Sequence, residues 1–184
     1  RERQARELAL ARRIQESSLP GPIDLPGSEI VGRMLPAQEV AGDFYEHFPL
    51  PHGRVALIVG DVSGKSVSAA LFAARAAQLL RSLASVLDPA DALAQVNAML
   101  ARSNPEQMFV TLFFAVSDPA QQTLHWINAG HNPPLLIRAD GRSERLDRRG
   151  GLALGLLQGK RYSPSQSAFA AGDLLAIRSA GAYG

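Results

Sequence analysis

Two aspartates frame a turn signal in the first third of the chain. Asp43 and Asp61 lie at equal distances along the sequence on either side of His52, which belongs to the turn signal Leu50-Pro51-His52-Gly53. If this turn closes an antiparallel hairpin, the two aspartates are directly opposed, with Cα atoms about 4.5–5.5 Å apart and side chains on one face. Carboxylates placed that closely repel each other unless one is protonated or a cation lies between them. The spacing therefore predicts a metal site at the open end of a hairpin.

The residue types at this hairpin leave two interpretations open. Carboxylate oxygens are hard ligands suited to Mg²⁺ or Mn²⁺, and Gly42 and Gly60 beside the aspartates would let the backbone and ions approach closely. Asp is also common in turns, so both aspartates could instead cap turns at the strand ends. The spacing alone does not separate these two interpretations.

A nucleotide site is a weaker alternative for the same region. The segment from Gly60 to Ser66 follows a predicted strand, precedes a predicted helix and contains Gly64-Lys65-Ser66. A phosphate-binding loop, however, requires four residues between its glycines, so that successive N–H groups surround the phosphate. Here Val59 stands where the first glycine would be needed, and Asp61 would place a carboxylate against the phosphates.

Length and composition restrict the class of protein. The 184 residues suit one domain with a single compact core, and 17 acidic against 19 basic residues are too balanced to predict a nucleic-acid partner. No apolar run approaches the ~20 residues that a membrane helix needs, so no membrane insertion is expected. The absence of cysteine excludes disulfides and thiolate metal sites and fits a cytoplasmic protein.

Residues 1–19 predict a linker or regulatory helix. They contain no Gly or Pro, and Pro20-Gly21-Pro22 stops the helix abruptly. Because the chain begins inside this charged helix without a cap, we expect a piece of a longer protein with a sensor domain upstream. The helix could dimerise or pass a signal from that sensor to the metal site.

Residues 20–184 predict one α+β domain. One helix is expected from a cap at Ser63 or Ser66 through Leu87, and a second follows with Asp88 as cap and Pro89 at its first position. Helices thus come as a consecutive pair between runs of strands, and the closely linked strands must be antiparallel. The strand candidates are residues 29–35, 44–50, 54–60, 108–116, 123–129, 135–138 and 172–177.

The stretch from Asn128 to Pro134 predicts an irregular corner between two strands, because Gly130 and a pair of prolines interrupt it. His131 in this corner could donate a proton or bind a metal. Alternatively, His131 and the side chains of Asn128 and Asn132 could satisfy the backbone of the loop. Loop polar groups must find partners in any case, which favours the structural interpretation.

Several motifs occur in order and at compatible spacing along essentially the whole chain. They are Glu39-Val40-Ala41-Gly42-Asp43-Phe44-Tyr45, Val59-Gly60-Asp61-Val62-Ser63-Gly64-Lys65, Ala69-Ala70-Leu71-Phe72, Met108-Phe109-Val110-Thr111-Leu112-Phe113, Asn128-Ala129-Gly130-His131-Asn132-Pro133-Pro134 and Leu154-Gly155-Leu156. Together they resemble the SpoIIE-type branch of the metal-dependent PPM serine/threonine phosphatases. The leading helix, which ends in Ile14-Gln15-Glu16-Ser17-Ser18-Leu19-Pro20, resembles the linker of that branch.

The resemblance implies an α-β-β-α four-layer sandwich, in which two antiparallel sheets are flanked by helices and a two-metal site lies between the sheets. It implies that Asp43, Asp61 and the backbone carbonyl of Val62 hold two divalent cations, Mn²⁺ or Mg²⁺. A metal-activated water would then hydrolyse phosphoserine or phosphothreonine on a regulatory protein, such as an anti-sigma-factor antagonist.

Two departures from the family pattern put this activity in question. Ser179-Ala180-Gly181 stands where the family has Thr-Asp-Gly, so Ala180 marks a lost ligand position. The family also continues to an Asp-bearing strand beyond Gly184, so the phosphatase domain is expected to be C-terminally incomplete. We therefore expect weak metal binding and slow or absent hydrolysis. The alternative function is a pseudophosphatase that binds a partner and signals through the helix at 1–19.

Overall fold

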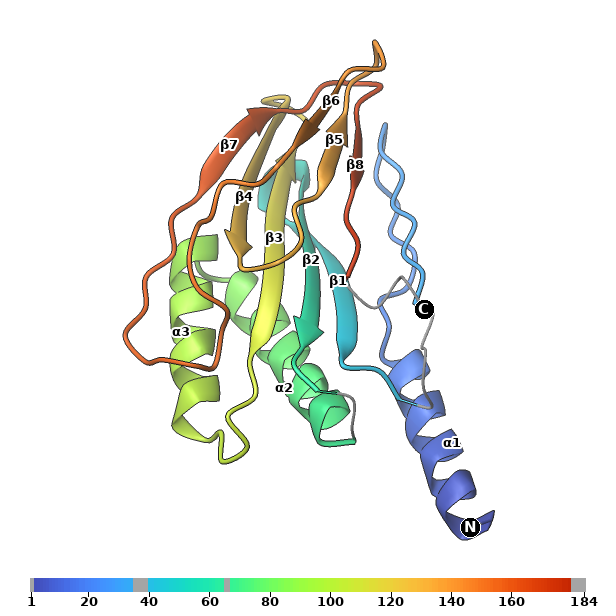
Figure 1. The fold of residues 1–184 in the computed structure, drawn as a ribbon. Helices are drawn as coiled ribbons and strands as arrows, with labels where there is room; N and C mark the ends of the chain where they lie inside the picture. Colours follow the sequence, from blue (N-terminus) through green and yellow to red (C-terminus); the bar gives the residue numbers. More distant parts are fainter. Residues whose placement is uncertain (1, 35–39, 65–66, 180–184) are drawn as a thin grey trace.

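The computed structural model describes residues 2–34, 40–64 and 67–179 (Figure 1). In these residues the chain forms three α-helices and eight strands. Their order is α1 (Glu2–Ser17), β1 (Asp43–Leu50), β2 (Arg54–Val62), α2 (Val67–Ala84), α3 (Pro89–Arg102), β3 (Val110–Asp118), β4 (Thr123–Ala129), β5 (Leu135–Ile137), β6 (Ser143–Arg145), β7 (Ser165–Ala168) and β8 (Leu174–Ala176).

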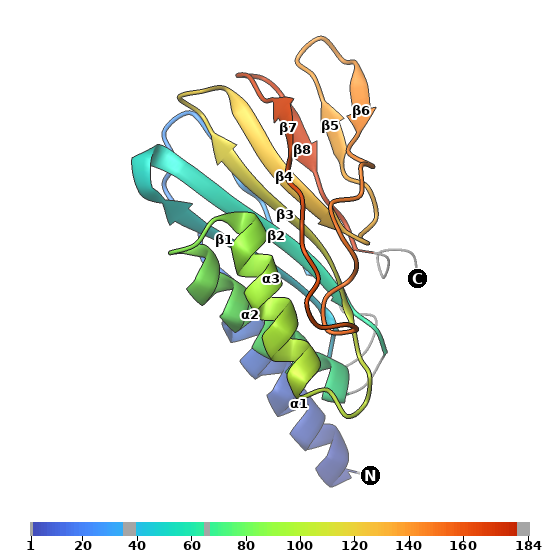
Figure 2. The ribbon, with the colours of Figure 1, turned by 90° about the vertical axis from the view of Figure 1, so that its left-hand side faces the viewer.

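The strands form two antiparallel sheets of different size. The larger sheet has the order β1-β2-β3-β4-β7, and the smaller one has the order β6-β5-β8. Helices α2 and α3 cover one face of the large sheet, and the small sheet lies over the other face (Figure 2). The α+β class and the pair of antiparallel sheets are thereby confirmed. Among the described residues, no helix covers the outer face of the small sheet.

Alternation along the strands explains this layering, because successive side chains point to opposite faces of a sheet. Phe44, Phe48 and Ile58 are buried on the helical face. Phe113 and Trp126 are buried on the other face, with ring centroids 5.8 Å apart, in a cluster that includes residues of the small sheet and its connections. The large sheet therefore carries a core on each side.

The β1–β2 hairpin has the register that the turn signal predicted. Leu50 pairs with Arg54 at the turn, and Asp43 pairs with Asp61 at the open end. His52 and Gly53 close the turn with φ values of 66° and 71°. Glycine adopts this left-handed conformation freely, whereas a histidine does so at some cost. Both predicted strands and their pairing are confirmed.

Three sequence predictions about local structure were wrong in part. Residues 29–34 form no ladder with a described strand, and Leu35 lies outside the described residues. Helix α2 ends at Ala84 and not at Leu87, because the Ser85 hydroxyl donates to the carbonyl of Arg81 and competes with the helical hydrogen bond. Helix α2 begins at Val67, four residues after Ser63, so Ser63 is not its cap and its hydroxyl accepts from the Phe109 N–H instead; Ser66 lies outside the described residues.

A partly buried ion pair ties α2 to β1. Arg81 Nη1 on α2 lies 2.7 Å from Glu46 Oε2 on β1, and the guanidinium carbon lies 5.5 Å from the centroid of the Phe48 ring. Burial raises the pKa of Glu46, and the hydrogen bond from Arg81 opposes that rise. The pair thus fixes the helix to the strand that carries Asp43.

The predicted N-terminal helix is α1, and its end docks on the segment that leads into β1. Gln15 Nε2 donates to the Ala41 carbonyl at 2.6 Å, and Gln15 Oε1 accepts from the Ala41 N–H at 3.0 Å. Further along α1, Leu10 and Ile14 are 51% and 59% exposed. No helix in the described ranges is both long enough and apolar enough to cross a lipid bilayer.

Candidate functional site

The two aspartates share one face at the open end of the β1–β2 hairpin. The Val62 N–H donates to the Gly42 carbonyl at 3.2 Å, so Gly42 and Val62 form a hydrogen-bonded pair. The next pair, Asp43 and Asp61, is therefore a non-hydrogen-bonded pair, the type in which Cα atoms are closer, at about 4.5 Å. Both residues are half-buried. Their direct opposition is confirmed, and their role as metal ligands stays a prediction.

The glycines beside the aspartates have different roles. A Cβ on Gly42 would lie 3.1 Å from the Val62 carbonyl oxygen, so glycine allows the two backbones to approach at the hairpin end. A Cβ on Gly60 would instead collide with the Phe44 ring, which fills that space on the face opposite the aspartates. The interpretation of Gly60 as room for ions was therefore wrong, because its missing side chain serves core packing.

Two hydroxyl residues, to which the sequence analysis gave no role although both stand in family motifs, contact the aspartates. Ser179 Oγ, just after β8, donates to Asp43 Oδ2 at 2.9 Å. Thr111 on β3 pairs with Asp61 in the ladder, and its hydroxyl lies 3.4 Å from the Asp61 carbonyl oxygen. The β2–β3 register points to Thr111. The triplet Ser179-Ala180-Gly181 marks the position of Ser179, but no local pattern predicts its contact with Asp43.

The predicted corner at 128–134 packs against the same site. His131 Nε2 lies 3.1 Å from the Arg178 carbonyl, and Nδ1 lies 3.1 Å from the Thr111 hydroxyl. Because a carbonyl oxygen only accepts, Nε2 carries the proton and Nδ1 of the neutral ring accepts from Thr111. Burial lowers the pKa of His131, against the opposing influence of the Arg178 carbonyl and of Asp43. Both ring nitrogens thus have partners, which favours the structural interpretation of His131.

The rest of the corner is held by its own side chains. Asn128 Nδ2 donates to the His131 carbonyl, and Asn128 Oδ1 accepts from the His131 N–H at 2.8 Å. Gly130 adopts a φ of 78°, which suits a residue without a side chain. Asn132 is exposed at the corner. Of the four predicted loop residues, only Asn132 presents its side chain to solvent.

The donor set fits a hard divalent cation but is small. In the described ranges, no three Asp, Glu, His or Cys side chains form a group that could hold a metal ion. Two opposed carboxylates match the oxygen ligands that Mg²⁺ and Mn²⁺ prefer, and Mg²⁺ keeps several waters when one or two carboxylates hold it. Lys65, Ser66 and Ala180 lie outside the described residues.

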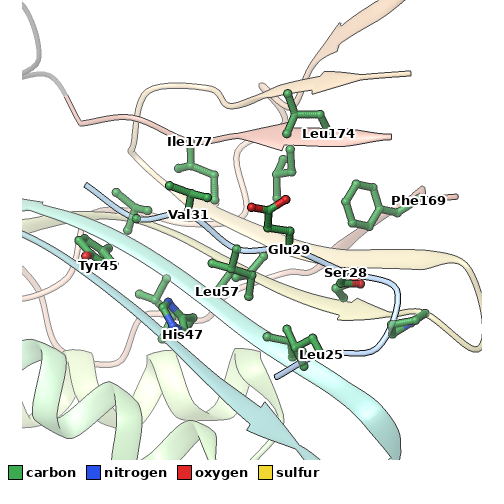
Figure 3. Close-up of a pocket in the computed structure, with 18 of the residues that line it drawn as sticks. Leu25, Ser28, Glu29, Val31, Tyr45, His47, Leu57, Phe169, Leu174 and Ile177 are labelled. Carbon is green, nitrogen blue, oxygen red and sulfur yellow. The ribbon is translucent and has the colours of Figure 1, made fainter. Parts of the chain in front are cut away.

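A cavity of about 940 Å³ opens between the two sheets on the face that carries Asp43 (Figure 3). Asp43 and Ser179 line it, but Asp61 does not. Most of its other wall is apolar and includes Leu25, Val31, Tyr45, Leu57, Phe169, Leu174 and Ile177. An apolar wall of this kind does not suit a phosphate group. Charged and polar residues such as Glu29 and His47 interrupt this wall, and the opposed carboxylates lie at one end of it.

A search of family models matches residues 51–183 to the family described as Stage II sporulation protein E (SpoIIE). The chain belongs to the SpoIIE family. This result confirms the resemblance to the SpoIIE-type branch of the PPM phosphatases. Asp61 and the corner at 128–134 fall inside the matched region, whereas Asp43 lies just before it.

Named relatives of this SpoIIE-family chain agree with the assignment. Protein IcfG of Synechocystis is 30% identical over 92% of the chain, and the phosphoserine phosphatase RsbP of Bacillus subtilis is 26% identical over 89%. The chain spans only 31% and 42% of the lengths of these two proteins. The structure of the PP2C phosphatase domain of SpoIIE from Bacillus subtilis superimposes with a TM-score of 0.67 at 20% identity, covering 77% of this chain and 41% of that one.

Proposed function

We propose that this domain hydrolyses phosphoserine or phosphothreonine on a regulatory protein, such as an anti-sigma-factor antagonist, in a reaction that depends on Mn²⁺ or Mg²⁺. The observation that carries the proposal is the direct opposition of Asp43 and Asp61 in a non-hydrogen-bonded pair. Membership of the SpoIIE family and the name of the relative RsbP support the same reaction. Such a substrate would be met in the cytoplasm, in agreement with the absence of cysteine.

In this proposal Asp43, Asp61 and the Val62 carbonyl hold the cations. Two bound divalent cations would supply an activated water and neutralise charge on the phosphoryl oxygens. Ser179 donates to one oxygen of Asp43 and thereby orients that carboxylate, leaving its other oxygen for a ligand. The hydrogen bond between Thr111 and His131 connects β3 to the adjacent corner. Because Thr111 pairs with Asp61 in the ladder, this contact would help to hold Asp61 in place opposite Asp43. The chain itself needs no nucleophilic side chain for this reaction.

We further propose that the site lacks part of its ligand set. Ala180 directly follows Ser179, the residue that contacts Asp43, and it stands at the position where the family has a carboxylate. With two carboxylates the site would hold a second cation weakly. If the second cation does not bind at all, the competing function follows, a pseudophosphatase that binds its partner without turnover.

The division into a linker at 1–19 and a phosphatase domain at 20–184 is part of the same proposal. The contact between Gln15 and Ala41 supports a linker that reaches the segment leading into the strand that carries Asp43. The exposed side chains of Leu10 and Ile14 support self-association of this helix as a homodimer. An upstream sensor would then act through α1.

A Mn²⁺-dependent assay on a phosphoserine peptide tests the proposed function. The full-length protein should turn over slowly, and Ala180→Asp should increase the rate, whereas Asp61→Asn should abolish it. Rapid hydrolysis by the Ala180 protein would contradict the incomplete site. If neither the natural protein nor Ala180→Asp binds Mn²⁺ or hydrolyses the peptide, the phosphatase proposal fails. A rise in melting temperature with ATP or GTP would instead favour the nucleotide alternative at Gly64-Lys65-Ser66.

A further inference from the structure

The loop between β6 and β7 exposes three leucine side chains. We call residues 148–161 the leucine loop. Leu152, Leu156 and Leu157 in this loop are 49%, 47% and 52% exposed, whereas Leu154 between them is fully buried. Single exposed leucines are common on protein surfaces, but three within six residues of one loop concentrate apolar surface there.

The leucine loop is held rigidly, so its exposed leucines do not result from a loose chain. Asn97 of α3 is fully buried, and its side chain accepts from the Gly155 N–H at 2.9 Å and donates to the Leu157 carbonyl at 2.8 Å. Asn104 donates to the Gly155 carbonyl at 2.9 Å. Leu154 exchanges two backbone hydrogen bonds with Val110. Side chains and backbone together fix which leucines face solvent.

The leucine loop lies beside the candidate metal site. Leu154 pairs with Val110 at the start of β3, and Val110 pairs on its other side with Val62, the neighbour of Asp61. Two strand spacings separate Leu154 from Val62, a distance of about 10 Å. Figures 1 and 2 show the loop next to α3, at the end of the molecule where β2 ends. The loop is therefore within reach of a folded protein whose phosphoserine enters the aspartate site.

Basic residues flank the leucines on both sides. The leucine loop begins with Arg148 and Arg149, ends with Lys160 and Arg161, and contains no acidic residue. None of these four cations has an ion pair within the described part of the chain, although nearby Arg142 pairs with Asp140. An apolar centre with a cationic rim is complementary to an acidic surface around an apolar patch.

We propose that the leucine loop is the docking surface for the folded phosphoprotein substrate. The loop would contact an apolar patch on that protein. This patch has an acidic rim and lies next to the phosphoserine. The inference rests on the proposed function. It adds the surface that would make the enzyme specific for a folded substrate. A short phosphopeptide would fill the aspartate end without covering the leucine loop.

Two loop variants and two matched controls test the docking surface. The apolar variant combines Leu152→Ser, Leu156→Ser and Leu157→Ser, and the charge variant combines Arg148→Glu and Arg161→Glu. Val86→Ser, at a residue 78% exposed in the α2–α3 connection, controls for loss of a surface apolar side chain. Arg145→Glu, at an exposed residue of β6, controls for charge reversal.

The probes are a folded anti-sigma-factor antagonist phosphorylated on serine, a short peptide with the same phosphosite, and vesicles of phosphatidylglycerol and phosphatidylcholine. Calorimetric binding to the full-length protein is measured first, because it does not require turnover. Each loop variant should bind the folded phosphoprotein roughly tenfold more weakly, while both controls bind it normally. Peptide hydrolysis, where present, should be unchanged in all variants.

Three results would overturn the docking surface. The first is that the natural protein does not bind the folded phosphoprotein, or that the loop variants bind it as well as the natural protein does. The second is an equal loss for peptide and protein, which would mean that the loop supports the aspartate site. The third is binding of the natural protein to vesicles that the loop variants lose, with phosphoprotein binding intact, which would assign the loop to a membrane. A failure of peptide hydrolysis alone bears on the proposed function and not on docking.

Discussion

The side-chain amide of Gln15 hydrogen-bonds both backbone polar groups of Ala41, in the way that a neighbouring strand would. Ala41 precedes Asp43 by two residues, so the last turn of α1 holds the segment that positions this carboxylate. The contact is partly buried and joins residues that are 26 positions apart. Movement of α1 would therefore be transmitted to one half of the aspartate pair.

Replacing Gln15 should loosen the start of β1. In Gln15→Ala both hydrogen bonds are lost, and we expect the free energy of unfolding to fall by about 1–2 kcal/mol, with faster amide exchange at residues 41–43. Urea unfolding and hydrogen exchange measure these effects. Arg12→Ala, which removes only the exposed pair with Glu16, should cost no more than about 0.5 kcal/mol. Equal effects of the two variants would show that the Gln15 contact does not hold this segment.

Removing one charge of the aspartate pair should separate metal binding from folding. Without metal, Asp43→Asn or Asp61→Asn should unfold at the same temperature as the natural protein or at a higher one, because the repulsion between opposed carboxylates is relieved. Addition of Mn²⁺ should raise the melting temperature of the natural protein but not of either variant. Asp140→Asn, at an exposed residue, serves as the control. An unchanged Mn²⁺ response in both site variants would exclude the pair as ligands.

The Glu46–Arg81 pair should make stability depend on pH in the acidic range. Because burial raises the pKa of Glu46, the folded state binds its proton more tightly than the unfolded state does. The natural protein should therefore lose stability relative to Glu46→Gln as the pH rises from the ordinary value of 4.5 through the folded-state pKa. Urea unfolding between these limits measures the difference. A difference that stays constant with pH would contradict the assignment.

Removing Arg81 alone should be more harmful than removing Glu46. Arg81→Met leaves the carboxylate buried without its partner and should cost about 2 kcal/mol at neutral pH. This is less than for a fully buried pair, because the Arg81 side chain is 45% exposed. The double variant Glu46→Gln with Arg81→Met should recover most of that loss. No recovery in the double variant would mean that Arg81 acts through its contact with Phe48 instead.

His131 should contribute a pH dependence of the opposite sign. Because burial lowers the pKa of His131, the neutral ring is favoured in the folded state. Stability should thus fall as the pH drops from the ordinary value of 6.5 toward the folded-state pKa. His131→Gln should remove this part of the pH dependence, and His125→Gln, at an exposed residue of β4, should retain it. Thermal unfolding of both variants across this pH range measures the effect. An identical slope of stability against pH in the two variants would contradict the prediction.

The hairpin could be predicted from the sequence because its determinants are local. The turn at 51–53 and the two strands beside it are neighbours along the chain, so the pairing of Asp43 with Asp61 follows from counting outward from the turn. The short polar strands β6 and β7 gave no such signal. Their side chains are largely exposed or half-buried and do not alternate in hydrophobicity, so only their partners in space define them.

By itself the sequence determined the family, the α+β order of elements and the two opposed carboxylates, since each depends on motifs or on contacts close along the chain. Only the tertiary structure decided that Ser179 reaches Asp43 across 136 positions, and that His131 has partners on both ring nitrogens. It also decided which leucines of the 148–161 loop are exposed, because Asn97 on α3 holds the Leu157 carbonyl and Asn104, in the turn after α3, holds the Gly155 carbonyl. Such contacts depend on how the sheets and helices stack, and no spacing along one segment encodes that stacking.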